Sequence, residues 1–190
     1  MPARILETQR LILRSPDTSD AEEFARFHRE NREHLAPWSP VRQEAFFTAA
    51  WWSSTLQAME ASMLAGESLA LGLYLKSAPT VLIGTCKFDQ IARGPFQSCM
   101  LGYSLDHRCA GNGYMTEALH SAIRCMFEEY RLHRIQANHL RENVRSAAVL
   151  ARLGFVVEGL APAYLYINGG WRDHVLTALL NPEFNEEWLK

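Results

Sequence analysis

The sequence predicts an α/β protein of the α+β kind, with one mixed, mostly antiparallel sheet flanked by helices. Three observations lead to this fold class. Short apolar runs bounded by turn residues are typical of strands. Longer segments with apolar residues every three or four positions are typical of amphipathic helices. Several strands follow one another without an intervening helix, which favours antiparallel pairing. The length of 190 residues suits a single domain, which we expect to span residues 1–190.

The predicted elements follow one another along the whole chain without an internal repeat or a linker. The first half has a strand at 11–14, a helix from Ser19 or Asp20 to about Asn31, a rigid bend at 37–40, a helix at 44–64 and strands at 69–75 and 81–88. The second half has a strand at 98–105, a helix at 114–130, a strand at 135–140 and a helix from Asn143 to Gly154. A strand that begins at 155–157 and a hairpin of 164–167 with 171–179 follow.

Breakers and caps define the elements of the N-terminal half. Pro16 ends the first strand, and Asp20 is a residue type that caps the helix after it. Phe24 and Phe27 lie on one face of that helix, which we expect to face the core. Gly66 ends the second helix, since glycine is the usual residue just beyond a helix end.

Periodicity and turn residues define the C-terminal half. Apolar side chains recur every three or four positions from 115 to 126, which predicts a helix with one buried face. Gly154 ends the next helix. The segment Asn-Gly-Gly at 168–170 separates two β-like runs and predicts a hairpin turn.

Composition excludes several classes of protein. Lys and Arg number 19 and Asp and Glu number 21, so a net charge of −2 argues against a generally basic surface for nucleic acid. The four cysteines form no Cys-x-x-Cys pair and no zinc pattern, so we expect reduced thiols and no metal. No apolar run approaches about 18 residues, and the first residues do not resemble a signal peptide. We therefore expect a cytoplasmic protein without a membrane segment.

The most informative segment is Arg-Cys-Ala-Gly-Asn-Gly at 108–113, between a predicted strand and a predicted helix. Unpaired amides and the positive end of the helix dipole meet at such a turn, and together they bind anions. Glycine lets the backbone approach a ligand closely. A tight turn without a ligand is the alternative at this point. A Walker loop is absent, and Thr116 stands where a dinucleotide fingerprint needs Gly or Ala.

A second segment, Asn143 to Phe155, favours the interpretation of the glycine turn as an anion site. It opens with Asn, carries small residues on one face and ends in Leu-Gly-Phe. This segment resembles the second signature of the GNAT acetyltransferase superfamily, and Arg108 to Gly113 resembles the first, Arg/Gln-x-x-Gly-x-Gly/Ala. Both occur in the family's order and spacing. The resemblance extends over nearly the whole chain.

Further segments are similar to the RimJ-type branch of that superfamily, which acetylates the N-terminal alanine of a small-subunit ribosomal protein. The last predicted strand, Trp171 to Leu179, is the most specific match. The other similar segments are 8–11, 35–42, 93–96, 101–104, 133–135 and 150–155. The resemblance implies a protein N-terminus beginning with Ala as the partner, with no nucleic acid or membrane required, and a monomer or weak dimer.

The resemblance implies acetyl-CoA as co-substrate, bound between splayed strands at 98–105 and 134–140. A bulge near 103–105 is expected to free backbone groups for the pantetheine and the thioester carbonyl. The residues that the resemblance assigns to acetyl-CoA are Tyr103, Ser104, Leu105, Arg108, Gly111, Asn112, Gly113, Tyr114, Met115, Thr116, Asn138, Asn143 and Ser146.

The catalytic groups depart from the commonest family pattern. Asn138 and Leu150 stand where many members carry a Glu base and a Tyr acid. Relatives of the RimJ and RimL type place a Ser three residues after the signature Asn, so Ser146 is the expected proton donor to the leaving thiolate. The base stays open, and its candidates are Tyr103, Asp89, Glu158, His139, His174 or a water molecule.

The acceptor is expected on the other side of the splay, against Trp38, Arg42, Trp171 and Arg172. Two alternatives to an N-terminal acetyltransferase remain. One is an acetyltransferase for a small amine, which would favour an acidic groove rather than arginines. The other is a non-catalytic acyl-CoA-binding protein or ribosome-assembly factor.

Overall fold

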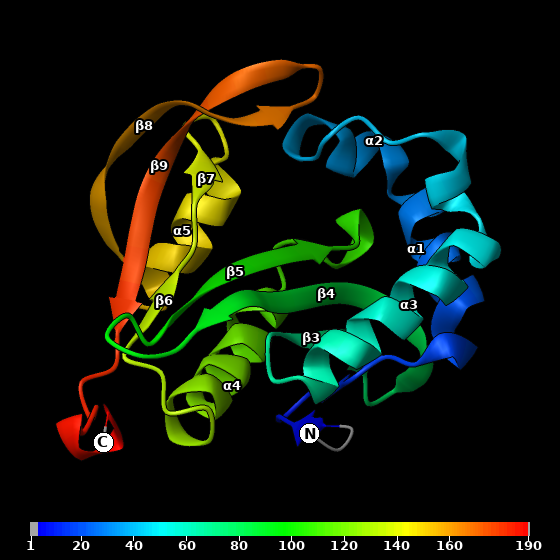
Figure 1. Ribbon diagram of the computed structural model, residues 1–190. Helices are drawn as coiled ribbons and strands as arrows, with labels where there is room; N and C mark the ends of the chain where they lie inside the picture. The colour runs from blue at the N-terminus through cyan, green and yellow to red at the C-terminus, as the bar shows by residue number, and fades with distance from the viewer. Residues whose placement is uncertain (1–3, 190) are drawn as a thin grey trace.

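One nine-stranded sheet forms the centre of the computed structural model, which describes residues 4–189 (Figure 1). The strands are Ile5–Glu7 (β1), Leu11–Arg14 (β2), Leu69–Leu75 (β3), Ala78–Ala92 (β4), Ser98–Leu105 (β5), Arg134–Gln136 (β6), His139–Leu140 (β7), Val156–Ile167 (β8) and Gly170–Leu180 (β9). Their order is β1-β2-β3-β4-β5-β6-β9-β7, and β8 pairs with β9. Only the β5–β6 pairing is parallel, so the mixed, mostly antiparallel sheet is confirmed.

Helices pack on both faces of this sheet. The α-helices are Ala21–Glu30 (α1), Arg32–Leu35 (α2), Ala49–Leu64 (α3), Tyr114–Glu128 (α4) and Val144–Arg152 (α5), with short 3₁₀ turns at Thr18–Asp20 (η1), Ala36–Trp38 (η2), Glu44–Phe47 (η3), His107–Cys109 (η4) and Glu186–Leu189 (η5). Leu11 and Leu13 of β2 belong to the core cluster that contains α4. Ile12 between them packs against the second cluster, built from α1 and α3. Successive side chains of a strand point to opposite faces, so α4 lies on one face and α1 with α3 on the other.

The strand predicted at 81–88 is longer, since β4 spans Ala78–Ala92, and β1 was not predicted. Three further predictions differ from the observed elements for identifiable reasons. The helix predicted at 44–64 is divided, because Thr48 is extended and its side chain accepts from the Trp51 amide, so α3 begins only at Ala49. The strand predicted at 135–140 is interrupted between β6 and β7. There the Asn138 side chain, rather than a backbone carbonyl, accepts from the Thr177 amide at 3.3 Å. The strand predicted to begin at 155–157 and the run predicted at 164–167 form one strand, β8, which contains two register shifts.

The central feature for function is the separation of β5 from β6. The two strands pair only at Ser98–Met100 with Arg134–Gln136, after which β7 continues against β9 instead. The second half of β5 is therefore paired with β4 along one edge, and its other edge has no strand partner. The splay predicted for these strands is confirmed, and in Figure 1 it opens toward α2 and the β8–β9 hairpin.

Candidate active site

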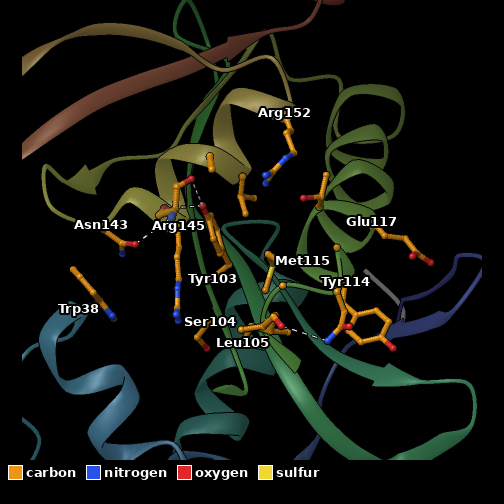
Figure 2. A pocket seen from close by; sticks show the side chains of 18 of the residues that line it. Trp38, Tyr103, Ser104, Leu105, Tyr114, Met115, Glu117, Asn143, Arg145 and Arg152 are labelled. Atoms are coloured by element: carbon orange, nitrogen blue, oxygen red, sulfur yellow. Dashed lines mark hydrogen bonds between the residues drawn. The ribbon is translucent and has the colours of Figure 1, made fainter. Parts of the chain in front are cut away.

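A cavity of about 1090 Å³ lies at the splay, between the end of β5, the first turn of α4, one face of α5 and the segment after α1 (Figure 2). It collects most of the residues predicted for the cofactor, and also Trp38. Those that line it are Trp38, Tyr103, Ser104, Leu105, Gly111, Asn112, Gly113, Tyr114, Met115, Thr116, Asn143 and Ser146.

The glycine turn before α4 has the geometry of an anion cradle. Gly111 and Gly113 have φ of +82° and +76°, which favours glycine, and Gly113 is the N-cap residue of α4. No side chain in the described part of the chain caps this end, so the amides of the first turn keep no helical acceptor. The turn is held from outside by Arg10, which donates to the Asn112 carbonyl at 3.0 Å and to Glu117 at 2.7 Å. This arrangement leaves the amides directed at the cavity.

Arg108 does not take part in this cradle, which corrects the expectation for it. Its guanidinium bonds to the Asp106 carboxylate at 2.6 Å and to Glu30 at 2.6 Å. The side chain lines a separate recess of about 490 Å³ that does not include the glycine turn. Arg108 thus holds the loop after β5 against α1 through charge-assisted hydrogen bonds to both carboxylates.

The bulge expected near 103–105 is absent within the described residues. The pairing of β5 with β4 is regular from Met100 to Leu105, and the irregularity lies on β4 between Asp89 and Ala92. Free backbone groups arise in another way. The amide of Asp106 donates to Ile83 of β4, and groups alternate along a strand, so the peptide groups of Tyr103 and Leu105 face the splay. They have no strand partner there because β6 has diverged.

Two hydroxyls from different elements meet inside the cavity. The Tyr103 Oη lies 2.7 Å from the Ser146 Oγ, and the Ser146 amide donates to the Asn143 side chain at 3.0 Å. Asn143 is therefore the N-cap of α5 and positions Ser146 in its first turn. Burial raises the pKa of Tyr103 to about 12, so its phenol is protonated at neutral pH. The pair can donate a proton into the cavity.

Besides Arg108, four predicted site residues do not line the cavity. Asn138 faces β9 and donates to the Tyr164 hydroxyl at 3.2 Å. The guanidinium of Arg42 packs over the Phe46 ring, 4.6 Å from its centroid. Trp171 and Arg172 are exposed on β9, beside the hairpin turn.

The hairpin still reaches the rim of the cavity. The Asn168 amide at its tip donates to the Ser39 carbonyl at 3.0 Å, and Ser39 lines the cavity next to Trp38. In Figure 1 the β8–β9 hairpin arches toward α2.

Most of the predicted base candidates are engaged elsewhere. Asp89 pairs with Lys87, and Glu158 pairs with Arg134. His139 and His174 are buried, and each ring lies within hydrogen-bond distance of a neighbouring backbone carbonyl. Of the named candidates, only Tyr103 lines the cavity.

The cavity also contains residues that the sequence analysis missed. On α5 these are Arg145, Ala148, Val149 and Arg152, whose spacing of three and four positions marks one helix face. That periodicity was available in the sequence. His34 also lines the cavity, but no pattern in the sequence singles it out. The remaining ones are Leu35, Ser39, Ala110, Glu117 and His120.

Two features of residues 4–189 concern metal binding and membrane insertion. No group of three or more His, Cys, Asp or Glu side chains is placed to hold a metal ion in this range. None of the helices described here is long and apolar enough to cross a bilayer.

Comparison with known proteins gives consistent matches. Residues 10–156 match the family described as "Acetyltransferase (GNAT) domain". The chain is 41% identical over 184 residues to "[Ribosomal protein uS5]-alanine N-acetyltransferase" of Escherichia coli (strain K12), covering 97% of this chain and 94% of that protein. Among solved structures, ribosomal-protein-S5-alanine acetyltransferase from Vibrio fischeri matches with a TM-score of 0.91 and 39% identity, over 96% of this chain and 99% of that one. Mycobacterium smegmatis RimJ in complex with CoA-disulfide matches with a TM-score of 0.86 and 30% identity, over 98% and 88%.

Proposed function

The chain belongs to the GNAT family of acetyltransferases, and from that membership we propose that it transfers acetyl from acetyl-CoA to the N-terminal alanine of a ribosomal protein. The observation that carries the proposal is the nearly full-length match to an E. coli protein named for that reaction on ribosomal protein uS5. Because the match extends beyond the cofactor signatures to the hairpin, it supports a similar acceptor as well as a similar donor.

The anion cradle fits the phosphates of acetyl-CoA, which supplies an acetyl thioester when bound. We assign the pyrophosphate to the amides of Gly113, Tyr114 and Met115, where helix geometry leaves donors without acceptors. Thr116 and Arg152 also line the cavity, and we add their hydroxyl and positive charge to this assignment. Arg108 is left out of this assignment because Asp106 and Glu30 hold its guanidinium.

The free edge of β5 fits the acyl end. We assign the peptide groups of Tyr103 and Leu105 to the pantetheine and the thioester carbonyl, because these groups face the splay without a strand partner. An amide directed at a carbonyl oxygen stabilises the negative charge that develops there during acyl transfer. Ser104 lines the same part of the cavity.

The hydroxyl pair fits the role of acid. Tyr103 stays protonated, and with its hydroxyl as the donor to the Ser146 Oγ, the Ser146 proton is free to pass to the departing thiolate. Asn143 holds the serine in place as the helix cap, and its remaining donors are available to the pantetheine.

The acceptor side is assigned to the wall formed by Trp38 and the β8–β9 hairpin. Trp38 lines the cavity and is 36% exposed, which suits a side chain that stacks against a peptide. Trp171 and Arg172 follow the hairpin tip that bonds to Ser39. Arg42 packs on Phe46 and does not line the cavity, so it is left out of this assignment.

Mass spectrometry of acetylated peptides tests this function. A peptide beginning with Ala and carrying an internal Lys is incubated with acetyl-CoA and the protein, and the modified nitrogen is located by fragmentation. We expect acetylation of the α-amine alone. The same peptide with a blocked N-terminus serves as control and should remain unmodified. Absence of acetylation on any α-amine would rule out the proposal, and transfer to polyamines alone would favour the small-amine alternative.

Three further expectations, on domain organisation, cellular location and oligomeric state, accompany the proposal. One sheet connects the cradle to the last strand, which supports a single domain over residues 1–190. A ribosomal substrate supports a cytoplasmic location. We also propose a monomer or weak dimer, which sedimentation at micromolar concentrations tests directly.

A further inference from the structure

His34 occupies the wall of the cavity opposite α5. It lies in α2, a single helical turn, and it lines the cavity together with Leu35 and Trp38. Tyr103 and Ser146 line the same cavity from β5 and α5. An imidazole is thus present on the acceptor side of the site.

A buried amide fixes the position of this turn. Asn31, immediately before α2, is fully buried and bonds through its side chain to the loop directly after β5. Its Nδ2 donates to the Asp106 carboxylate at 3.3 Å, and its Oδ1 accepts from the His107 amide at 2.9 Å. A helix turn brings residues i and i+3 to one side, so His34 faces the same loop as Asn31. The His34 and His107 rings accordingly lie 6.0 Å apart.

The charges facing His34 come from two directions. Arg145 on α5, beside Ser146, and His107 after β5 both disfavour a proton on its ring, while Asp106 favours one. Burial acts most strongly and also disfavours the charged form. Together they lower the pKa of His34 below its usual value, so the ring is neutral at pH 7 and can accept a proton.

The other titratable groups in the cavity have different tasks. Glu117 accepts from Thr8 at 2.6 Å and from Arg10, which ties it to the outer side of the glycine turn. Tyr103 keeps its proton at neutral pH. His120 lies one turn beyond Thr116 on α4, at the phosphate end. His34 is therefore the one neutral imidazole on the acceptor wall among the residues that line the cavity.

We propose that His34 is the general base of the reaction, taking a proton from the N-terminal ammonium of the acceptor bound between α2 and the β8–β9 hairpin. This inference rests on the proposed function. It assigns the group that neither the sequence signatures nor the usual family position at Asn138 supplies.

With this assignment, the protons gained and lost in the acetyl transfer balance. The ammonium gives one proton to His34, which releases it to solvent after the reaction. The neutral nitrogen then forms its bond to the acyl carbon as the carbon–sulfur bond breaks. The nitrogen loses its second excess proton to solvent. The sulfur receives one proton from Ser146, which regains it from Tyr103, and Tyr103 regains it from solvent. The net products are the acetylated amine, the free thiol and one proton.

The pH dependence of kcat for an Ala-starting peptide tests the assignment. A peptide α-amine has a pKa near ~8, so without a base only about a tenth of it is neutral at pH 7. In the wild type we expect kcat to stay level from pH 9 to below pH 6.5, since His34 deprotonates the bound amine. In His34→Gln we expect kcat to fall about tenfold at pH 7 and to approach the wild-type value at pH 9.

His133→Gln is the matched control, because His133 packs against Phe184 near the C-terminus and does not line the cavity. It should keep the wild-type profile. Acetyl-CoA affinity and thermal unfolding of each variant show whether the site is intact. Recovery of kcat in His34→Ala at pH 7 on addition of imidazole is an independent test of the assignment.

Three results overturn the assignment. One is a wild-type kcat that already falls below about pH 8, which needs no variant at all. Another is a His34→Gln profile that parallels the wild type, even if KM rises, because that marks a binding role only. The third is a wild type that acetylates no α-amine, which removes the proposed function along with the base. The first two leave acetylation of the peptide intact, so the two failures are distinguishable.

Discussion

The hydroxyls of Tyr103 and Ser146 lie 2.7 Å apart although 43 positions separate them in the chain. Tyr103 comes from the edge of β5 that β6 leaves open, and Ser146 comes from the first turn of α5. The contact therefore bridges the two sides of the splay. It makes the proposed acid a pair rather than a single side chain.

We expect Ser146→Ala to lower kcat about a hundredfold while acetyl-CoA affinity changes little, because the lost group acts on the leaving thiolate. Steady-state kinetics and calorimetric titration with CoA separate the two effects. Ser53→Ala, an exposed serine on α3, is the control and should behave as wild type. Equal losses in kcat for both variants would contradict the role of Ser146.

Tyr103→Phe should lower kcat less than Ser146→Ala, because Ser146 retains its own proton. The double variant should be no slower than Ser146→Ala alone, since Tyr103 acts only through the serine. The four kcat values form a double-mutant cycle. Additive losses would show that the two hydroxyls act independently.

Charge at the glycine turn should decide cofactor binding. Gly111→Glu places a carboxylate beside the amides assigned to the pyrophosphate, and we expect at least a tenfold weaker affinity for CoA than in Gly111→Gln. Both variants share the same backbone strain at φ +82°, roughly 1–2 kcal/mol, so their difference isolates the charge. Gly66→Glu, at a similar φ of +75° after α3, controls for a remote carboxylate. Equal CoA affinities for the Glu and Gln variants would exclude the cradle as the phosphate site.

A substitution in the acceptor wall, which is formed by Trp38 and the β8–β9 hairpin, should change KM for the peptide and leave the affinity for acetyl-CoA unchanged. We expect Trp38→Ala to raise KM for an Ala-starting peptide roughly tenfold, because an exposed aromatic face for the peptide is lost. The Kd for acetyl-CoA should remain unchanged. Trp188→Ala, near the C-terminus against Phe184, provides the control. A rise in the Kd for acetyl-CoA instead would move Trp38 to the donor side.

The Asp106 carboxylate should make stability depend on pH in the acid range. The Arg108 side chain, the Arg108 amide and Asn31 hold its pKa well below the usual range, against the opposing effect of burial. A depressed carboxyl stabilises the folded state above its unfolded pKa of about 3.9, and this contribution is lost as pH falls below that value. Asp106→Asn should cost roughly 2 kcal/mol at pH 7 in urea unfolding, and less at pH 3.

Asp89→Asn, on an exposed part of β4, is the control for that measurement and should show a small difference at both pH values. A cost of Asp106→Asn that stays constant from pH 7 to pH 3 would contradict the depressed pKa of Asp106.

Much of the fold was predictable because its signals are local. The bounds of β3 and β5 were predicted to the residue, since turn residues flank each strand. The error at 44–64 arose because Thr48 was not recognised as a helix cap inside a long apolar segment. The interruption between β6 and β7 was not predictable, since it depends on a side-chain bond from Thr177 to Asn138 across the sheet.

The site was predictable in part for the same reason. Gly111, Gly113 and Ser146 belong to short motifs, and all three line the cavity. Arg108 belonged to such a motif and yet points elsewhere, because Asp106 and Glu30 bind it. His34 belongs to no motif, and its place in the cavity follows from the bonds of Asn31.

By itself, the sequence determined most of the strands and helices, the glycine turn and the capped helix α5, because caps, turns and periodicity act over a few residues. Only the tertiary structure decided which side chains face the cavity. The bond from Asn31 to Asp106 joins residues 75 positions apart, and the Tyr103–Ser146 pair joins residues 43 positions apart. Such contacts form only when the helices and loops pack on the sheet, so no local sequence pattern encodes them.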